Sequence, residues 1–221
     1  MNVSEALQKR HSTRAFLDKA VDRSLIETIL EDAGHAPSGT NTQPWQVAVL
    51  TGETRQKLQQ QMEQAFRGGQ KGKMDYTYYP TEWEEPYKSR RKACGLLMYS
   101  TLDIKREDKQ RQLDQWAANY RAFDAPVMLL FFMDGIMQTG SYIDYGMFIQ
   151  SVMLSAISHG LATCPQAALG EFPQMAKEML GYQDDSIMIC GIALGYEDKD
   201  ALVNSYRTAR EPVESFTRFF D

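Results

Sequence analysis

An unbroken run of apolar residues at positions 127–133 constrains the fold of this chain more than any other feature. The run has the length of a strand, and continuous apolar character is typical of a strand that is buried on both faces. Residues 187–194 have the same character. The sequence therefore predicts a sheet that is covered by other elements on both sides.

The covering elements are expected to be helices. Ile26, Ile29, Leu30 and Ala33 recur at helical spacing over residues 24–33. We predict a capping box at Ser24 and Glu27, with Gly34 just past the end of this helix. A capping box of Asn2 and Glu5 predicts a first short helix that leads to Arg10. Further expected elements are a strand at 45–51, helices at 54–66, 90–102, 107–119 and 143–159, and a helix with Pro173 in its first turn.

Helices and strands mix without strict alternation of strand and helix, so we predict one α+β domain over residues 1–221. Two parts lack a regular pattern. Residues 67–90 hold glycines, prolines and several aromatic residues, and long irregular segments of this kind are commonly functional. Residues 196–221 end in Phe216, Phe219 and Phe220, which need a surface to pack on.

Composition excludes several classes of protein. The net charge is -5, and no basic block is long enough to follow a phosphate backbone, so nucleic acid is not an expected partner. Three widely spaced cysteines suggest a reducing compartment. No signal peptide and no membrane-spanning run is recognisable, so the expected location is the cytoplasm, away from the membrane.

Two arginines and a hydroxyl lie close together near the N-terminus. If the chain is extended there, the side chains of Arg10, Ser12 and Arg14 fall on one face and converge on one ligand. The guanidinium group matches the geometry of phosphate and keeps its charge. A polar turn at 36–45, rich in amides and hydroxyls, follows. The alternative is that these arginines are solvated after a helix.

Together these blocks resemble the FMN-dependent nitroreductase family, in particular its branch that reduces nitrobenzoate-like compounds. The resemblance rests on Arg-His-Ser-Thr-Arg-x-Phe at 10–16, Ala-Pro-Ser-x-x-Asn-x-Gln-Pro-Trp at 36–45, and similar blocks at 119–126, 163–170 and 204–214. It implies an α+β nitroreductase-like fold with a central, mostly antiparallel sheet. It also implies that the tail at 196–221 embraces a partner subunit. Residues 67–90 are expected to form a lid-like insertion for a separate reason, because their aromatic residues could cover the site and select the acceptor.

The resemblance implies roles for particular residues toward FMN. Arg10, Arg207, Arg210 and Ser12 are expected at the phosphate, Arg14 near the flavin N1 and O2, and Asn119 at the pyrimidine edge. Pro165, Gln166 and Ala167 are expected to face the flavin N5 edge, where a backbone N–H makes the contact. The loop of Pro37, Ser38, Gly39 and Asn41 is expected to meet the flavin of the neighbouring subunit. Arg207 in an interface ion pair and Asn119 as a helix C-cap are the alternatives.

Several motifs are missing from the sequence. It has no G-x-G-x-x-G, no Walker A motif and no G-x-S-x-G elbow. The three histidines show no ligand spacing, so no metal is expected. Cys164 fits better as a small apolar filler than as a nucleophile. The chain itself therefore offers no catalytic residue, which suits an enzyme whose chemistry is carried by its cofactor.

We expect a homodimeric flavoprotein oxidoreductase that transfers hydride from NADH or NADPH to a nitroaromatic or quinone acceptor in a ping-pong cycle. Tyr79, Trp83 and Tyr87 are expected to stack on the acceptor, with ordinary core or dimer contacts as the alternative. Two other functions stay open. One is a reductive dehalogenase, although Glu84, Tyr87 and Lys88 are crowded compared with the spacing that its lid needs. The other is a flavin-binding protein without turnover.

Overall fold

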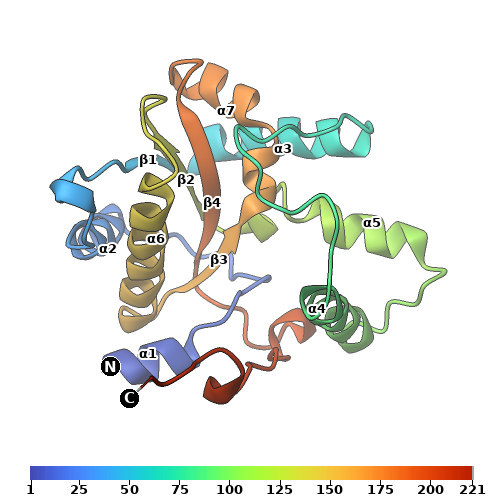
Figure 1. Ribbon diagram of the computed structural model, residues 1–221. Coiled ribbons are helices and arrows are strands. Elements are labelled where there is room, and N and C mark those ends of the chain that lie inside the picture. Colours follow the sequence, from blue (N-terminus) through green and yellow to red (C-terminus); the bar gives the residue numbers. More distant parts are fainter. Residues whose placement is uncertain (221) are drawn as a thin grey trace.

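The structure is a computed structural model and describes residues 1–220. Figure 1 shows a sheet between two groups of helices, with both termini on one side of the molecule. The helices are α1 (Val3–Lys9), α2 (Arg23–Gly34), α3 (Gly52–Arg67), α4 (Tyr87–Thr101), α5 (Lys109–Ala117), α6 (Ser141–Ser158) and α7 (Pro173–Leu180). The strands are β1 (Gln46–Leu50), β2 (Val127–Met133), β3 (Ala162–Gln166) and β4 (Ile187–Gly195). Short 3-10 turns include η1 (Gly39–Asn41), η3 (Ala167–Glu171) and η4 (Leu202–Asn204).

The sheet has the strand order β1-β2-β4-β3, and each neighbouring pair is antiparallel. The two apolar runs of the sequence, β2 and β4, occupy its centre, as predicted. Their pairing shifts register between Phe131 and Phe132. The α+β fold with an antiparallel sheet is confirmed.

Strand β3 was not predicted. Pro165 and Gln166, for which the sequence predicted no secondary structure, belong to this strand and pair with β4 opposite Ile192 and Gly191. The proline disguises the strand. It is tolerated there because β3 is at the edge of the sheet, where a missing N–H breaks no ladder.

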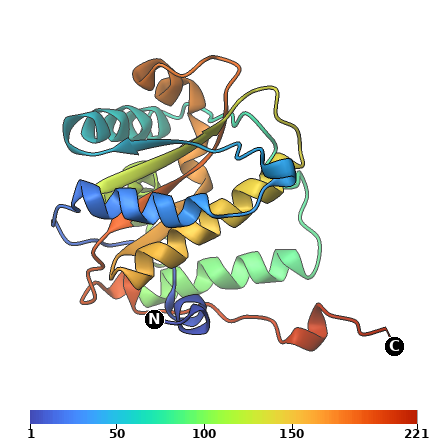
Figure 2. The ribbon, with the colours of Figure 1, turned by 90° about the vertical axis from the view of Figure 1, so that its left-hand side faces the viewer.

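The side chains of β2 alternate between two cores, which explains why the whole strand is apolar. Leu129, Phe131 and Met133 pack in the cluster that contains α2 and α6. Met128, Leu130 and Phe132 pack in the cluster that contains α3 and α7. Figure 2, turned by 90°, shows α2 and α6 in front of the sheet. The three layers confirm the prediction of a sheet covered on both faces.

The helix ends agree only in part with the predictions. The Asn2–Glu5 capping box is present, with the Glu5 N–H donating to Asn2 Oδ1 at 2.9 Å. The Ser24–Glu27 box is wrong. The helix begins one residue earlier, after Asp22, and Glu27 pairs with Arg23 instead, at 2.7 Å. Gly34 is the last helical residue and not the residue after the end.

Two segments lie outside this three-layered body. Residues 68–86 contain no helix or strand and cross from α3 to α4, which lies beyond the sheet (Figure 1). The C-terminal segment runs past α4 and extends away from the body in Figure 2. No helix within residues 1–220 combines the length and the apolar character that crossing a membrane requires.

Candidate cofactor site

The segment with the two N-terminal arginines lies along the free edge of β3. Ser12 forms a parallel bridge with Thr163, and the Thr13 N–H donates to Thr163 O at 3.0 Å. The segment is therefore extended, as predicted, and it is fixed to the sheet by its backbone. Its side chains are supported by rigid structure rather than by a mobile loop.

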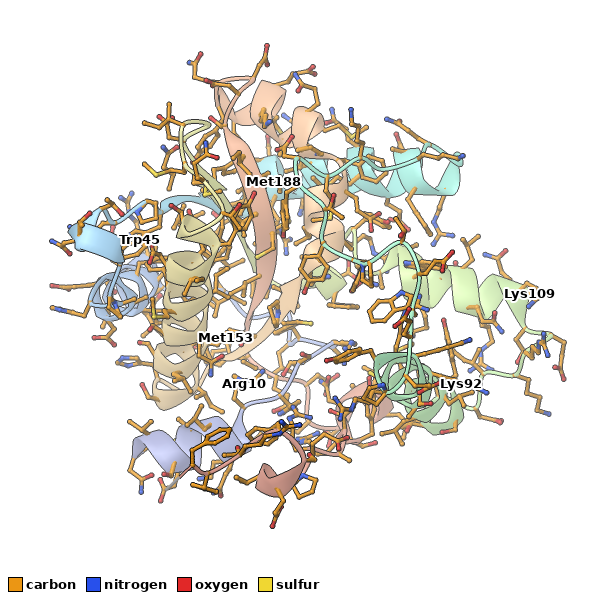
Figure 3. All side chains as sticks on the ribbon, viewed as in Figure 1. Arg10, Trp45, Lys92, Lys109, Met153 and Met188 are labelled. Atoms are coloured by element: carbon orange, nitrogen blue, oxygen red, sulfur yellow. The ribbon has the colours of Figure 1, made fainter. Side chains whose placement is uncertain are left out.

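A cavity of about 510 Å³ opens beside this segment. It is lined by three groups of residues, from the N-terminal segment, from α4 and from the tail. The lining includes Arg10, Ser12, Arg14, Cys94, Tyr206, Arg207, Thr208 and Arg210. The structure thus brings together, from opposite ends of the chain, all four arginines and the serine for which the sequence implied contacts with FMN. Figure 3 shows Arg10 between α1 and α4.

The cavity is strongly positive. Within residues 1–220, no carboxylate lies within ion-pair distance of Arg10, Arg14, Arg207 or Arg210. Burial, and secondarily the charge of Arg210, lower the pKa of Arg10 below its usual value. Arginines gathered without acidic partners repel one another, and an anion in the cavity relieves that repulsion. The donor set therefore fits the phosphate of a nucleotide-like cofactor.

The arginines are oriented by contacts with the chain. Arg14 Nη1 donates to Ser12 O at 3.2 Å and to Tyr206 Oη at 3.0 Å. Arg207 Nη1 donates to Asn204 O at 2.7 Å, while the interface ion pair considered for Arg207 requires a second chain and stays a prediction. Arg210 Nη1 donates to Thr208 Oγ1 at 2.7 Å.

Asn204 holds the tail against the N-terminal segment, a role that the sequence analysis missed. Its Oδ1 accepts the Arg14 N–H at 2.8 Å, and its Nδ2 donates to Ala15 O at 2.9 Å. The side chain is buried. His11 adds a second link through its Nε2 to Glu197 Oε1, at 2.9 Å. Both residues lie in or next to blocks that resemble the family, but spacing alone does not distinguish a residue that binds a ligand from one that aligns the ligand-binding residues.

A second polar pair lies at the end of β3. The buried Gln166 donates from Nε2 to Asn119 O at 2.9 Å, and this contact fixes the orientation of the amide. Its Oε1 is buried and has no partner in the part of the chain that the structure describes. Asn119 Nδ2 donates to Trp116 O at 3.0 Å, so this side chain also satisfies a carbonyl at the end of α5, as the alternative for Asn119 proposed. Gln166 Oε1 could therefore accept a hydrogen bond from an N–H group of a bound ligand.

The loop at 37–43 lies elsewhere in the chain. It is beside α2 and α6 in Figure 1, on the side of the sheet opposite α4, so one chain does not bring Pro37, Ser38, Gly39 and Asn41 to the arginine cavity. Thr40, Asn41 and Gln43 have positive φ angles of 49°, 59° and 47°. Such backbone is unfavourable for these residues and persists only when its surroundings fix it.

The expected lid divides into an anchored and an exposed part. The anchored part contains Asp75, whose carboxylate pairs with the buried Lys177 at 3.0 Å, and Tyr76, whose Oη donates to Ile189 O at 2.7 Å. The exposed part contains the three residues expected at the acceptor. Tyr79 and Tyr87 are 57% and 60% exposed, and Trp83 lies 5.6 Å from Tyr79 between ring centroids. In the chain described, Tyr79 and Tyr87 are therefore not ordinary core, whereas Trp83 is half-buried.

Cys164 lies under the cavity, where burial raises the pKa of its thiol to about 11. The nearby Arg14 and Ser12 act in the opposite direction but do not outweigh burial. The thiol is therefore protonated at neutral pH, which agrees with the expected role as a small apolar filler.

Three comparisons with known proteins agree. The chain matches the model of the Nitroreductase family over residues 7–196. It is 37% identical over 210 residues to a 4-nitrobenzoate reductase of Pseudomonas putida, covering 95% of this chain and 92% of that protein. The crystal structure of the FMN and NADPH-dependent nitroreductase NfnB of Sphigopyxis sp. strain HMH superimposes with a TM-score of 0.96 at 39% identity, covering 100% of both chains.

The FMN-dependent NfnB of Mycobacterium smegmatis, solved in complex with NADPH, superimposes with a TM-score of 0.92 at 29% identity, again covering 100% of both chains. The match of the family model covers most of the sequence, from the helix before the arginine segment to the end of β4. The relatives are matched along nearly their whole length. This chain therefore belongs to the nitroreductase family.

Proposed function

We propose that this chain is an FMN-dependent oxidoreductase that passes hydride from a nicotinamide donor to nitroaromatic acceptors. The observation that carries the proposal is the arginine cavity, in which Arg10, Arg14, Arg207 and Arg210 converge without an acidic partner among residues 1–220. The relatives named as FMN-dependent nitroreductases support the same reading.

The proposed roles are those that the family resemblance implies, and the lining of the arginine cavity supports them. Arg10 and Arg210, with Ser12, hold the FMN phosphate, because their donors face one cavity. Arg14 places a fixed positive charge toward the flavin N1 and O2, which favours the reduced, anionic form of the ring. The end of β3 at Pro165, Gln166 and Ala167, together with Asn119, faces the flavin edge. FMN held there would supply the two-electron chemistry that links the nicotinamide donor to the acceptor, in a cycle of the ping-pong type.

We propose that the site is completed in a homodimer, in which residues 37–41 of one chain meet the flavin of the other. Phe216, Phe219 and Phe220 support this, because they are 70%, 85% and 88% exposed. Apolar rings exposed in such a row are typical of an association surface. Cys94, Cys164 and Cys190 are free thiols, which supports the reducing cytoplasm as the proposed location.

The exposed part of the lid favours flat aromatic acceptors. Tyr79, Trp83 and Tyr87 offer ring surfaces for offset stacking. Nitrobenzoate-like compounds are the first class to test, and quinones are the second. The crowding of Glu84, Tyr87 and Lys88 gives no support to a lid that clamps an amino-acid zwitterion.

The test begins with the purified, yellow protein. Flavin released by acid is separated by chromatography, and we expect FMN in amounts close to one per chain. The holoenzyme is then given NADPH with 4-nitrobenzoate, menadione or a halogenated tyrosine in turn. Reduction of the first two supports the proposal. FAD, or no flavin, would overturn it, and dehalogenation without nitroreduction would assign the other function of this fold.

A further inference from the structure

Three cations at the start of α4 have no role in the site described above. Lys88, Arg91 and Lys92 are exposed and lie at helical spacing, so they share one face of the helix. Within residues 1–220, none of them lies within 4 Å of a carboxylate oxygen. We call these three residues the α4 cation cluster.

The charged residues next to the cluster in the sequence form no ion pair with it. Arg90 differs from the cluster because it pairs with Glu211 of the tail at 3.1 Å. Glu82, Glu84 and Glu85 precede the helix, and Glu85 Oε2 accepts the Ser89 N–H at 3.2 Å. These acids form no ion pair with the cluster in the structure described, so its three charges remain available to a ligand.

A pair of aromatic rings adjoins the cluster. The Arg91 guanidinium carbon lies 5.3 Å from the centre of the Trp83 ring, and Trp83 continues to Tyr79 at 5.6 Å. Exposed cations next to an indole are suited to a ligand that combines a phosphate with a planar base. An adenosine that carries a phosphate on its ribose has this combination.

The cluster is close to the arginine cavity without being part of it. Cys94, on the next turn of α4, lines the cavity together with Arg10 and Arg210. Arg90 ties the same turn of the helix to the tail. Figure 3 shows Lys92 on α4, on the side away from Arg10. A ligand whose reactive ring lies at the flavin would have to extend past the Cys94 turn of α4 to reach these cations.

We propose that the α4 cation cluster, with Trp83, binds the adenosine 2′-phosphate of NADPH and makes NADPH the preferred donor over NADH. The inference rests on the proposed function. Both donors present the same nicotinamide to the flavin, so a preference between them has to arise at the 2′-phosphate. The 2′-phosphate carries more than one negative charge. It therefore suits a cluster of several cations better than a ligand with a single carboxylate does.

The first arm of the test needs no turnover. Binding of adenosine 2′,5′-bisphosphate and of 5′-AMP to the holoprotein is measured by calorimetry. We expect the bisphosphate to bind at least about tenfold more tightly, and the K88A/R91A/K92A variant to lose this difference, as expected when charge-assisted contacts are removed. Equal binding of the two nucleotides by the native protein would overturn the inference, whether or not the protein is active.

The second arm measures kinetics. In the triple variant, we expect the KM for NADPH to rise at least about tenfold with little change in kcat, and the KM for NADH to stay within about twofold. Lys109→Ala, which removes an exposed cation of α5, is the matched control and should change neither constant. FMN content should be the same in all variants.

Two results would contradict the proposal. An unchanged preference for NADPH in the triple variant would mean that the 2′-phosphate is bound elsewhere. A rise in the KM for 4-nitrobenzoate alone would mean that the cluster binds the carboxylate of the acceptor. Loss of flavin from the native protein would refute the proposed function, while the nucleotide-binding arm would still decide the role of the cluster.

Discussion

Asp144 on α6 holds the backbone of Gly39 in place, since its Oδ1 accepts the Gly39 N–H at 3.1 Å. The carboxylate is mostly buried, and in the part of the chain that the structure describes it has no cationic partner. A second contact, from the Gln43 N–H to Ser38 Oγ at 2.9 Å, closes the same loop. These two hydrogen bonds oppose the strain of the left-handed residues between them.

Removal of this carboxylate should loosen the loop that we place at the flavin of the neighbouring subunit. Asp144→Ala is expected to weaken FMN binding by about fivefold, the cost of about one lost hydrogen bond of 1 kcal/mol. Asp144→Asn keeps an oxygen acceptor and should restore most of the affinity. The measurement is fluorescence quenching as apoprotein takes up FMN. Native affinity in the alanine variant would show that the loop does not contact the flavin.

The phosphate assignment predicts a larger effect. Arg10→Ala and Arg210→Ala should each weaken FMN binding by about 1.5 to 3 kcal/mol, because each removes a charge-assisted contact to the phosphate. Arg23→Ala is the control, since this exposed arginine pairs only with Glu27 on α2. Equilibrium titration of the three apoproteins decides the matter. If both cavity variants bind FMN like the control, the phosphate lies elsewhere.

The tail prediction concerns assembly. Replacing Phe216, Phe219 and Phe220 with serine should convert the dimer to monomer and lower its flavin content, because these rings are largely exposed in their own chain. The arginine cavity is built within one chain, so folding of the monomer should be retained in circular dichroism. Sedimentation velocity measures the change. A variant that remains a stable dimer would show that other surfaces hold the subunits together.

The lid prediction separates binding of the acceptor from binding of the cofactor. Shortening residues 77–84 should raise the KM for a nitroaromatic or broaden the range of acceptors, while FMN content and reduction by NADPH stay nearly unchanged. This deletion spares Asp75 and Tyr76, which anchor the segment to Lys177 and to β4.

Asp75→Ala tests the anchored part of the segment and is compared with the deletion of residues 77–84. It leaves the buried Lys177 ammonium without its carboxylate partner and with only the Asp184 carbonyl as an acceptor, so we expect a loss of about 3 kcal/mol in the free energy of unfolding. Chemical denaturation measures that loss, and steady-state kinetics measures the effect of the deletion. If the shortened protein loses flavin or becomes monomeric, the exposed part of the segment is structural and not a lid.

The sequence predicted those parts of the fold that depend on local pattern. The apolar runs at 127–133 and 187–194 became the two central strands, and the helices appeared within a few residues of their expected ends. The sequence could not predict β3, because Thr163, Pro165 and Gln166 carry no strand-like pattern and form a strand only through pairing with β4. The capping box at Ser24 failed for a related reason, since Asp22, two residues earlier, was an equally acceptable start.

The residues of the candidate site also divide into those that local sequence identifies and those that depend on contacts between distant segments. Residue type and resemblance identified Arg10, Ser12, Arg14, Arg207 and Arg210, which the fold gathers at one cavity. They did not identify Asn204, Asp144 or the orientation of Gln166, because these side chains act through contacts between segments that are distant in sequence. The pairing of the 37–41 loop with a flavin stays a prediction, because it requires a second chain.

The most direct test of the central claim is an anaerobic titration of the purified protein, followed through its flavin absorbance. We predict that NADPH bleaches the flavin completely in the absence of any acceptor, and that 4-nitrobenzoate added afterwards restores the oxidised spectrum. Separate reduction and reoxidation of this kind is the behaviour of an enzyme with two half-reactions. A flavin that stays oxidised with NADPH and NADH, or that is reduced but not reoxidised by any nitroaromatic, would contradict the account.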